Sequence, residues 1–201
     1  SNWETEGKSV LDAPIADCFV RAPLDNDICS SEVDNPSPEA WLAKWQRAGL
    51  FDLEHRCAGV EVSGQTIVSQ HEYLNDAGVA IRSVWTHTFD AEGSVDIAIE
   101  VSSAPEMPPL PRVGMRVLLS EKPQTVSWIG RGPHENYPDR KLSADLGAWS
   151  CDRQGMQTPY IFPSDNGLRC DVRQAVIGAV CIERIDNDFA FAISDFGAES
   201  L

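Results

Sequence analysis

Apolar and polar residues alternate along most of the chain, and this period of two is typical of half-buried β-strands. Between residues 79 and 89 the odd-numbered positions include large apolar side chains such as Ile81 and Trp85, whereas the even-numbered positions are mostly small or polar. After the polar turn at residues 90–94, residues 95–101 alternate in the same way. The two segments are therefore predicted to form an antiparallel hairpin with one buried face.

Further segments with this pattern extend the prediction to the rest of the chain. A second hairpin is predicted to join residues 57–62 to residues 66–73 through the turn at 63–65. Other predicted strands cover residues 113–119, 126–130, 180–186 and 189–194. Short strands separated by turns indicate an all-β fold, an antiparallel β-sandwich, and we expect residues 1–201 to form a single domain of this kind.

One segment departs from the strand pattern and predicts a short helix. Ser37 can cap the helix and Pro38 suits its first position. Trp41 and Trp45 then lie one turn apart, and Gly49 can end the helix. The two tryptophans could bind a partner, but packing of this stripe on the protein's own sheet is the favoured interpretation.

The overall charge limits the class of partner. The 201 residues carry a formal net charge of −15, which disfavours nucleic acid and anionic membranes because both need a basic surface. A neutral ligand such as a sugar is compatible with this charge. The sequence has no apolar run of membrane-spanning length and no N-terminal basic region followed by an apolar stretch. A soluble, cytoplasmic protein is therefore expected.

Cysteine and histidine are spread through the sequence. No two cysteines form a C-x-x-C pair, and the histidines are scattered. The cysteines are Cys18, Cys29, Cys57, Cys151, Cys170 and Cys181, and the histidines are His55, His71, His87 and His134. A disulfide framework and a metal cluster are both disfavoured by this spacing. The cysteines are expected to be free thiols in a reducing cytosol.

Three segments combine proline, carboxylates and arginine, two of them with glycine as well, as a generic surface loop rarely does. The most informative is residues 130–140, Gly-Arg-Gly-Pro-His-Glu-Asn-Tyr-Pro-Asp-Arg, directly after an apolar strand end. The others are residues 19–27, Phe-Val-Arg-Ala-Pro-Leu-Asp-Asn-Asp, and the Pro-, Asp- and Arg-rich residues 158–173. Glycine and proline fix an irregular backbone, and charged groups in such a place need partners.

In this order and at these separations, the three segments closely resemble the C-terminal β-sandwich domain of the large bacterial β-galactosidases, glycoside hydrolase family two. The resemblance runs from about Trp3 to the last residue. It implies a supersandwich fold similar to that of galactose mutarotases. It also implies that the chain is an incomplete fragment of this small-chain domain, which agrees with a start at Ser1 rather than at methionine.

The resemblance further implies what the parent protein does. The parent is expected to be a retaining β-galactosidase that hydrolyses terminal β-D-galactosides of the lactose type. Its catalytic glutamates belong to a central barrel domain, so no catalytic residue is expected in this chain and the chain alone is expected to be inactive. Magnesium and sodium or potassium are expected cofactors of the parent, with no metal site here. The expected partners are the barrel of the same polypeptide, the β-galactoside bound by the parent, and further copies in a homo-oligomer.

Acidic residues in the motifs raise the question of catalysis within the chain. Glycoside hydrolysis needs two opposed carboxyl groups, and Glu135 and Asp139, with Asp165 and Asp171 in reserve, are the candidates. The favoured interpretation instead gives these acids arginine partners that brace the loops. The residues assigned to this structural motif are Arg21, Asp25, Asp27, Glu135, Asn136, Tyr137, Asp139, Arg140, Arg169, Asp171 and Arg173.

Two other segments offer possible contact with a sugar. The Ser-, Asn- and Pro-rich loop after residue 28 is predicted to be exposed, and its counterpart in similar β-galactosidases borders the active site; the candidate residues are Cys29, Ser30, Ser31, Glu32, Val33 and Asp34. A solvent loop without function is the equally weighted alternative. Trp149 and Tyr160 lie in loop-like sequence where an aromatic ring could stack on a sugar, whereas Trp85 and Trp128 fit core strands.

Two functions from other classes remain open at this point. One is an independent carbohydrate-binding module, which should have complete sheets and an exposed aromatic platform. The other is a mutarotase-like sugar epimerase, in which His134 and Glu135 would need a second histidine such as His87.

Overall fold

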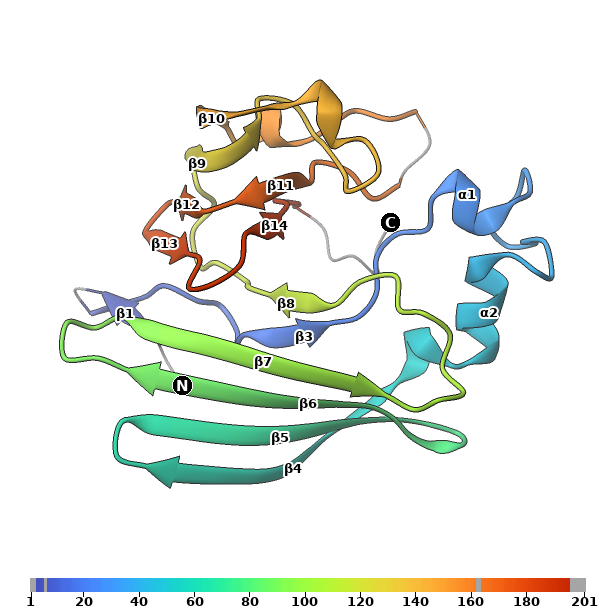
Figure 1. Ribbon diagram of the computed structural model, residues 1–201, viewed down its shortest axis with the longest axis horizontal. Helices are drawn as coiled ribbons and strands as arrows, with labels where there is room; N and C mark the ends of the chain where they lie inside the picture. Colours follow the sequence, from blue (N-terminus) through green and yellow to red (C-terminus); the bar gives the residue numbers. More distant parts are fainter. Residues whose placement is uncertain (1–2, 6, 162–163, 196–201) are drawn as a thin grey trace. The chain divides into compact units, whose positions relative to one another are not determined.

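The structure is a computed structural model that describes residues 3–5, 7–161 and 164–195 (Figure 1). The chain forms two compact units. We call Asp17–Met115 the central unit, and Ser1–Ala16 together with Arg116–Leu201 the terminal unit. The prediction that residues 1–201 form one incomplete domain stays a prediction.

The central unit is built on a four-stranded antiparallel sheet, drawn teal to green in Figure 1. Its strands lie in the order of the sequence: β4 (Glu54–Ser63), β5 (Thr66–Asn75), β6 (Gly78–Phe89) and β7 (Val95–Ser103). Both predicted hairpins are confirmed, and each strand is slightly longer than predicted. Side-chain alternation sets this register, because a shift by one residue would expose the apolar face.

The two faces of this sheet differ in chemistry. On one face, Ile81 and Trp85 are 1% and 3% exposed, as the alternation predicts. On the other, the Glu72 carboxylate accepts hydrogen bonds from the guanidinium groups of Arg56 and Arg82. Charged side chains paired in this way are typical of a sheet face turned to solvent.

Two short helices lie in the same unit: α1 (Asp25–Ile28) and α2 (Trp41–Arg47), followed by the 3₁₀-helix η1 (Leu50–Asp52). Helix α2 is the predicted helix, but its N-cap is Ala40 rather than Ser37. Ser37 instead begins a separate turn, in which the Ala40 N–H donates to the Ser37 carbonyl. Trp45 is buried, and Trp41, 42% exposed, stacks on it.

A single carboxylate organises the interior of the central unit. Asp17 accepts hydrogen bonds from the Tyr73 hydroxyl at 2.8 Å, the Ser83 hydroxyl at 2.5 Å and the Trp85 indole nitrogen at 3.0 Å. Burial and the neighbouring Asp17 charge raise the pKa of Tyr73 above its usual range. Asp17 therefore satisfies three polar groups on the inner face of the sheet, which also carries His55, His71 and His87.

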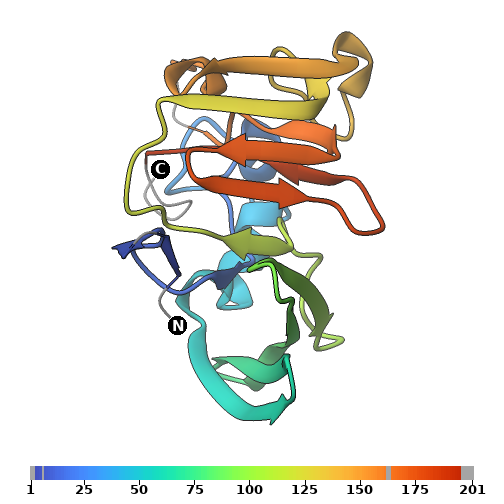
Figure 2. The same cartoon turned by 90° about the vertical axis from the view of Figure 1, so that its left-hand side faces the viewer.

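The terminal unit contains a second four-stranded antiparallel sheet, drawn yellow, orange and red in Figure 2. Its order is β10 (Asp145–Asp152), β9 (Thr125–Gly132), β12 (Gln174–Ile177) and β13 (Val180–Glu183). The shorter pairs are β11 (Arg169–Val172) with β14 (Phe189–Phe191), and β1 (Glu4–Thr5) with β2 (Lys8–Ser9). The 3₁₀-helices η2 (Lys141–Ser143) and η3 (Gln154–Met156) border this sheet.

The core of the terminal unit lies between the four-stranded sheet and the β11–β14 pair. Val126 and Trp128 of β9 pack with Val172 of β11 and Phe191 of β14, and each of these side chains is at most 9% exposed. Met156 closes this core and is completely buried. Two facing antiparallel layers with apolar inner faces form a β-sandwich, so the predicted all-β antiparallel fold class is confirmed.

Three predicted strands are shorter than expected: β13 and β14 end at Glu183 and Phe191, before residues 186 and 194, and the strand predicted at 113–119 is reduced most. Of residues 113–119, only β8 (Gly114–Arg116) is a strand, and it pairs with β3 (Ala16–Cys18). Val113 and Met115, predicted to be half-buried, are 60% and 40% exposed. Alternation marks a strand only where a partner continues beside it, and here the pairing ends after three residues.

No helix within the described part of the chain is long and apolar enough to cross a membrane.

Candidate functional site

The loop 130–140 and the segment 158–173 meet in the terminal unit through Asn136. Asn136 has no exposed surface; its backbone N–H donates to the Leu168 carbonyl at 2.9 Å. Its side-chain oxygen accepts from the Cys170 N–H at 3.0 Å, and its side-chain amide donates to the His134 carbonyl at 3.1 Å. Asn136 and Cys170 are 34 residues apart in sequence, so one buried amide holds the two motifs together. Phe162 and Pro163 of the second motif lie outside the described residues.

Glu135 lies at the centre of this junction and is 8% exposed. One carboxylate oxygen, Oε1, accepts two hydrogen bonds: one from the Arg140 guanidinium at 2.8 Å and one from the Tyr160 hydroxyl. The other oxygen accepts from the Gly167 N–H at 2.8 Å. Burial opposes ionisation, but these hydrogen bonds outweigh it and lower the pKa of Glu135. A general acid needs a raised pKa, so this environment favours a bracing carboxylate.

The lowered pKa of Glu135 predicts a pH-dependent contribution to stability. A carboxyl group whose pKa is lower in the folded than in the unfolded chain stabilises the fold above its unfolded pKa of about 4.3. That contribution is lost as the pH falls through the folded pKa. Denaturant unfolding of the wild-type chain and of Glu135→Gln should therefore differ most near pH 7, and the difference should shrink steadily below about pH 4. A difference independent of pH would contradict this role of the charge.

Arg169 is almost completely buried, at 2% exposed. Its guanidinium donates to the carbonyls of Pro133 at 3.1 Å, Gly167 at 2.9 Å and Gly155 at 3.3 Å. The guanidinium also lies over the Trp128 ring, 5.3 Å from its centroid. Arg169 therefore joins three chain segments through backbone oxygens, whereas a carboxylate partner was predicted.

Asp171 is held by two cations. Its carboxylate accepts from Lys141 at 2.8 Å and from Arg131 at 2.6 Å, and Arg131 also donates to the Ala144 carbonyl at 2.8 Å. The hydrogen bond from Lys141, followed by that from Arg131, lowers the pKa of Asp171. Asp171 has a φ of +52°, a left-handed conformation that aspartate tolerates better than most residues.

The remaining acids of the candidate set lie in different surroundings. Asp139 is exposed to solvent, and Asp165 accepts a hydrogen bond from the Tyr137 hydroxyl at 3.4 Å. Arg140 stacks over the Tyr137 ring at 4.8 Å. The contacts of Glu135 and Asp171 are thus cations and hydrogen-bond donors, which keep a carboxylate ionised and fixed.

The first motif lies in the central unit and has the same character on a smaller scale. Arg21 makes a two-pronged contact with Asp27, at 2.6 and 3.1 Å. The same carboxylate accepts the Leu24 N–H at 2.8 Å, which closes the first turn of α1. Asp25 begins this helix, where a negative charge is favourable.

The candidate loop at residues 29–34 follows directly on α1. Cys29 has a left-handed φ of +51°, and its thiol donates to the Asn26 carbonyl. The Ser30 hydroxyl donates to the carbonyls of Glu32 and Asn35, at 2.8 and 2.9 Å. Ser31, Glu32 and Asp34 are exposed, whereas Val33 packs on the core. The loop is therefore a turn with one apolar anchor and an exposed polar tip.

The other candidate sugar contacts are less open than predicted from sequence. Trp149 is half-buried and its indole nitrogen donates to the Gly130 carbonyl at 3.1 Å, while Tyr160 is 43% exposed but bound to Glu135. His134 contacts the Ser143 hydroxyl at 3.3 Å. His87 belongs to the central unit and stacks on Trp85.

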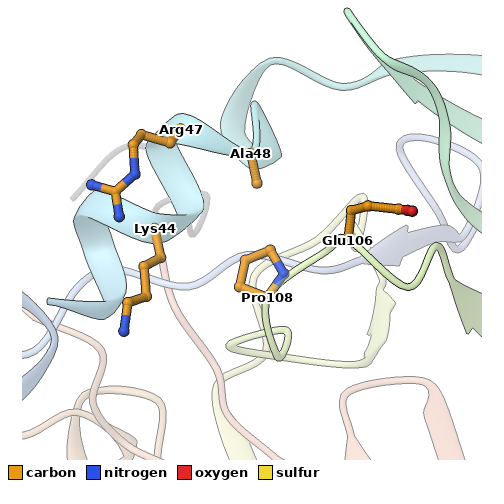
Figure 3. A pocket seen from close by; sticks show the side chains of 5 residues that line it. All are labelled: Lys44, Arg47, Ala48, Glu106 and Pro108. Atoms are coloured by element: carbon orange, nitrogen blue, oxygen red, sulfur yellow. The ribbon is translucent and has the colours of Figure 1, made fainter. Parts of the chain in front are cut away.

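A surface hollow of about 370 Å³ lies beside α2 (Figure 3). It is lined by Lys44, Arg47, Ala48, Glu106 and Pro108, and the two cations extend from the helix in the close-up view. No aromatic face belongs to this lining, so the hollow lacks the stacking platform that sugar recognition favours. Within the described residues, no group of three or more His, Cys, Asp or Glu side chains could hold a metal ion.

Some organising residues were not singled out from sequence. Asp17 is the clearest, and its only signal is that it is a lone acid in the otherwise apolar run 15–20. Lys141 and Met156 gave no signal, because their roles depend on segments about 30 and 20 residues away.

The whole chain, residues 1–201, matches the family model described as Beta galactosidase small chain. Among curated proteins, the Beta-galactosidase of Aeromonas hydrophila is 47% identical to it over 207 residues, which cover 100% of this chain and 20% of that protein. The Beta-galactosidases of Enterobacter cloacae and Vibrio cholerae serotype O1 are each 40% identical, over 100% and 99% of this chain. The chain spans about a fifth of the length of these relatives. On this evidence the chain belongs to the Beta galactosidase small chain family.

Proposed function

We propose that these residues are a non-catalytic segment of a β-galactosidase that hydrolyses terminal β-D-galactosides with retention of configuration. The environment of Glu135 carries this proposal. Its carboxylate is occupied by Arg140, Tyr160 and the Gly167 N–H, so it is neither protonated nor free to attack a substrate. The catalytic carboxyl pair then belongs to a barrel elsewhere in the parent polypeptide.

The role of the segment in that parent is support. The braced loops of the terminal unit and the turn at residues 29–34 provide rigid surfaces for packing against the barrel, for one wall of the substrate pocket and for assembly into a homo-oligomer. The magnesium and the sodium or potassium ions of the parent bind to ligands outside this chain. The parent acts in the cytoplasm, which agrees with six free cysteines.

The test replaces Glu135 with glutamine in the parent enzyme. A bracing residue should leave the kcat for a chromogenic β-galactoside within about tenfold of wild type at 25 °C, whereas loss of a catalytic acid or base typically costs about 10²–10⁴-fold. Melting of the parent, followed by differential scanning, should move to lower temperature in the same variant. Asp139→Asn, which alters an exposed acid of the same loop, is the matched control and should change neither quantity.

One result of this test would contradict a non-catalytic role of Glu135. If Glu135→Gln abolishes turnover while the melting temperature stays unchanged, Glu135 takes part in the chemistry and the proposal fails.

A further inference from the structure

The sheet of the terminal unit carries apolar side chains on both faces. One face contributes Trp128 to the core. The opposite face, which we call the outer face, presents Leu146, Ile129 and Val176, which are 57%, 44% and 37% exposed. Exposed Ala148 lies directly opposite Ile129 in the strand register. These side chains belong to β10, β9 and β12, neighbouring strands of the sheet, and Val176 lies diagonally from Ile129, opposite Ser127.

The outer face is also hollowed. A depression of about 230 Å³ is lined by Ile129, Gly130, Leu146, Gly147 and Arg173. Gly130 and Gly147 are cross-strand partners whose Cβ positions face the inner side, toward Val172 and Trp149, so on the outer face only their backbone is exposed between Ile129 and Leu146. The hollow therefore has apolar walls, a backbone floor and one cation at its edge, which suits an inserted side chain better than bulk water.

The sheet of the central unit shows what a solvent-facing sheet looks like in this chain. Its polar face carries the Arg56–Glu72–Arg82 ion pairs, and acidic Glu100 lies beside exposed Ala98 on the edge strand β7. The outer face of the terminal unit is less charged: Gln174, opposite Ile129 on β12, donates a hydrogen bond to Glu183 on the edge strand β13, whereas Ile129, Ala148 and Val176 are apolar. The exposed apolar side chains on the β10 side of this pair are the part of the face that a second layer would cover.

We infer that the outer face is the surface on which the remainder of the parent β-galactosidase polypeptide packs, through an apolar contact centred on Ile129 and Ala148. This inference rests on the proposed function. The relatives are about five times as long as the chain, so most of the parent lies outside these residues and is covalently linked to them. A tethered neighbour is present at high effective concentration and covers an apolar face more readily than a separate molecule.

Two matched alanines provide the test. Ala148 lies on the outer face and Ala98 on the charged face, and both are exposed on edge strands of four-stranded antiparallel sheets. In the intact parent, Ala148→Glu should lower the melting temperature by about 3 °C or more, because it places a charge in an apolar interface. Ala98→Glu should leave the melting temperature within about 1 °C of wild type.

Cysteine variants make the same comparison without a charge. In the folded parent, the thiol of Ala148→Cys should react with a maleimide at least about ten times more slowly than that of Ala98→Cys, and both should react alike in denaturant. Peptide mapping by mass spectrometry separates these thiols from the six native cysteines. Equal rates in the folded parent would overturn the inference.

Two further outcomes are distinguishable. If protection of Ala148→Cys disappears when the oligomer is diluted to monomers, a second copy covers the face and the inference is wrong. If the wild-type parent does not hydrolyse β-galactosides, the proposed function is wrong. The thiol measurement is independent of that result and still shows whether the rest of the parent covers the outer face.

Discussion

Replacing Arg169 with methionine is expected to lower the free energy of unfolding by about 3 kcal/mol, although its guanidinium donates to backbone carbonyls and to no carboxylate of the described residues. Methionine fills much of the space of the arginine stem, so the cavity term is small. The main cost is the loss of three donors: the Gly167 carbonyl is left unsatisfied in a buried place, at about 1–3 kcal/mol, and the part-buried hydrogen bonds to Pro133 and Gly155 are lost at about 1 kcal/mol each. Relief from burying a guanidinium charge offsets part of this cost.

Two comparison variants separate these effects. Arg169→Lys keeps the charge but cannot donate to three carbonyls in one plane, so it should recover only part of the stability. Arg173→Met is the matched control, because Arg173 is exposed and its carboxylate contact with Asp188 is 3.9 Å long; a change below about 1 kcal/mol is expected. Urea denaturation followed by tryptophan fluorescence measures all three. If Arg169→Met were as stable as wild type, the three carbonyls would not depend on this side chain.

Arg169 also shows how far sequence can predict the site. The abundance of Asp, Glu and Arg in the motifs indicates electrostatic bracing, and Glu135 with Arg140 and Asp171 with Arg131 lie in such contacts. Sequence proximity does not identify which partner an arginine takes once the chain folds. Arg169 takes backbone carbonyls, because the left-handed turn at Gly167 directs an oxygen toward it. Long-range partners such as Lys141 are fixed by tertiary structure alone.

The sheets were more predictable than the site for a physical reason. Alternation over 10 or more residues, as in β6, marks the face that each side chain occupies and therefore the register of the hairpin. The start of α2 was misplaced because Ser37 suits a turn as well as a helix cap. Helix α1, only four residues long, is set by one Asp27 hydrogen bond and has no periodicity that a sequence could display.

Glycine at position 167 connects the two halves of the braced junction. Its N–H donates to Glu135 and its carbonyl accepts from Arg169, at 2.8 and 2.9 Å. Its φ of +77° lies in the left-handed region, and a Cβ there would come within 2.5 Å of the Met156 carbonyl oxygen. A side chain at this position therefore has both a strained backbone and no space.

Gly167→Ala is accordingly expected to lower the free energy of unfolding by about 3–5 kcal/mol, from roughly 1 kcal/mol of left-handed strain and the rest from backbone displacement and the weakened Glu135 and Arg169 contacts. Gly178→Ala isolates the strain, since Gly178 has a φ of +60° but its Cβ would meet only Pro123, at 3.6 Å. That control should cost about 1 kcal/mol. Denaturant unfolding of both variants measures the difference between their losses of stability. Gly167, unlike Gly178, contacts Glu135, so Gly167→Ala alone should also weaken the pH dependence of stability assigned to that carboxylate. Equal losses for the two variants would mean that the junction yields to an added methyl group, and its rigidity could not then be the basis of its supporting role.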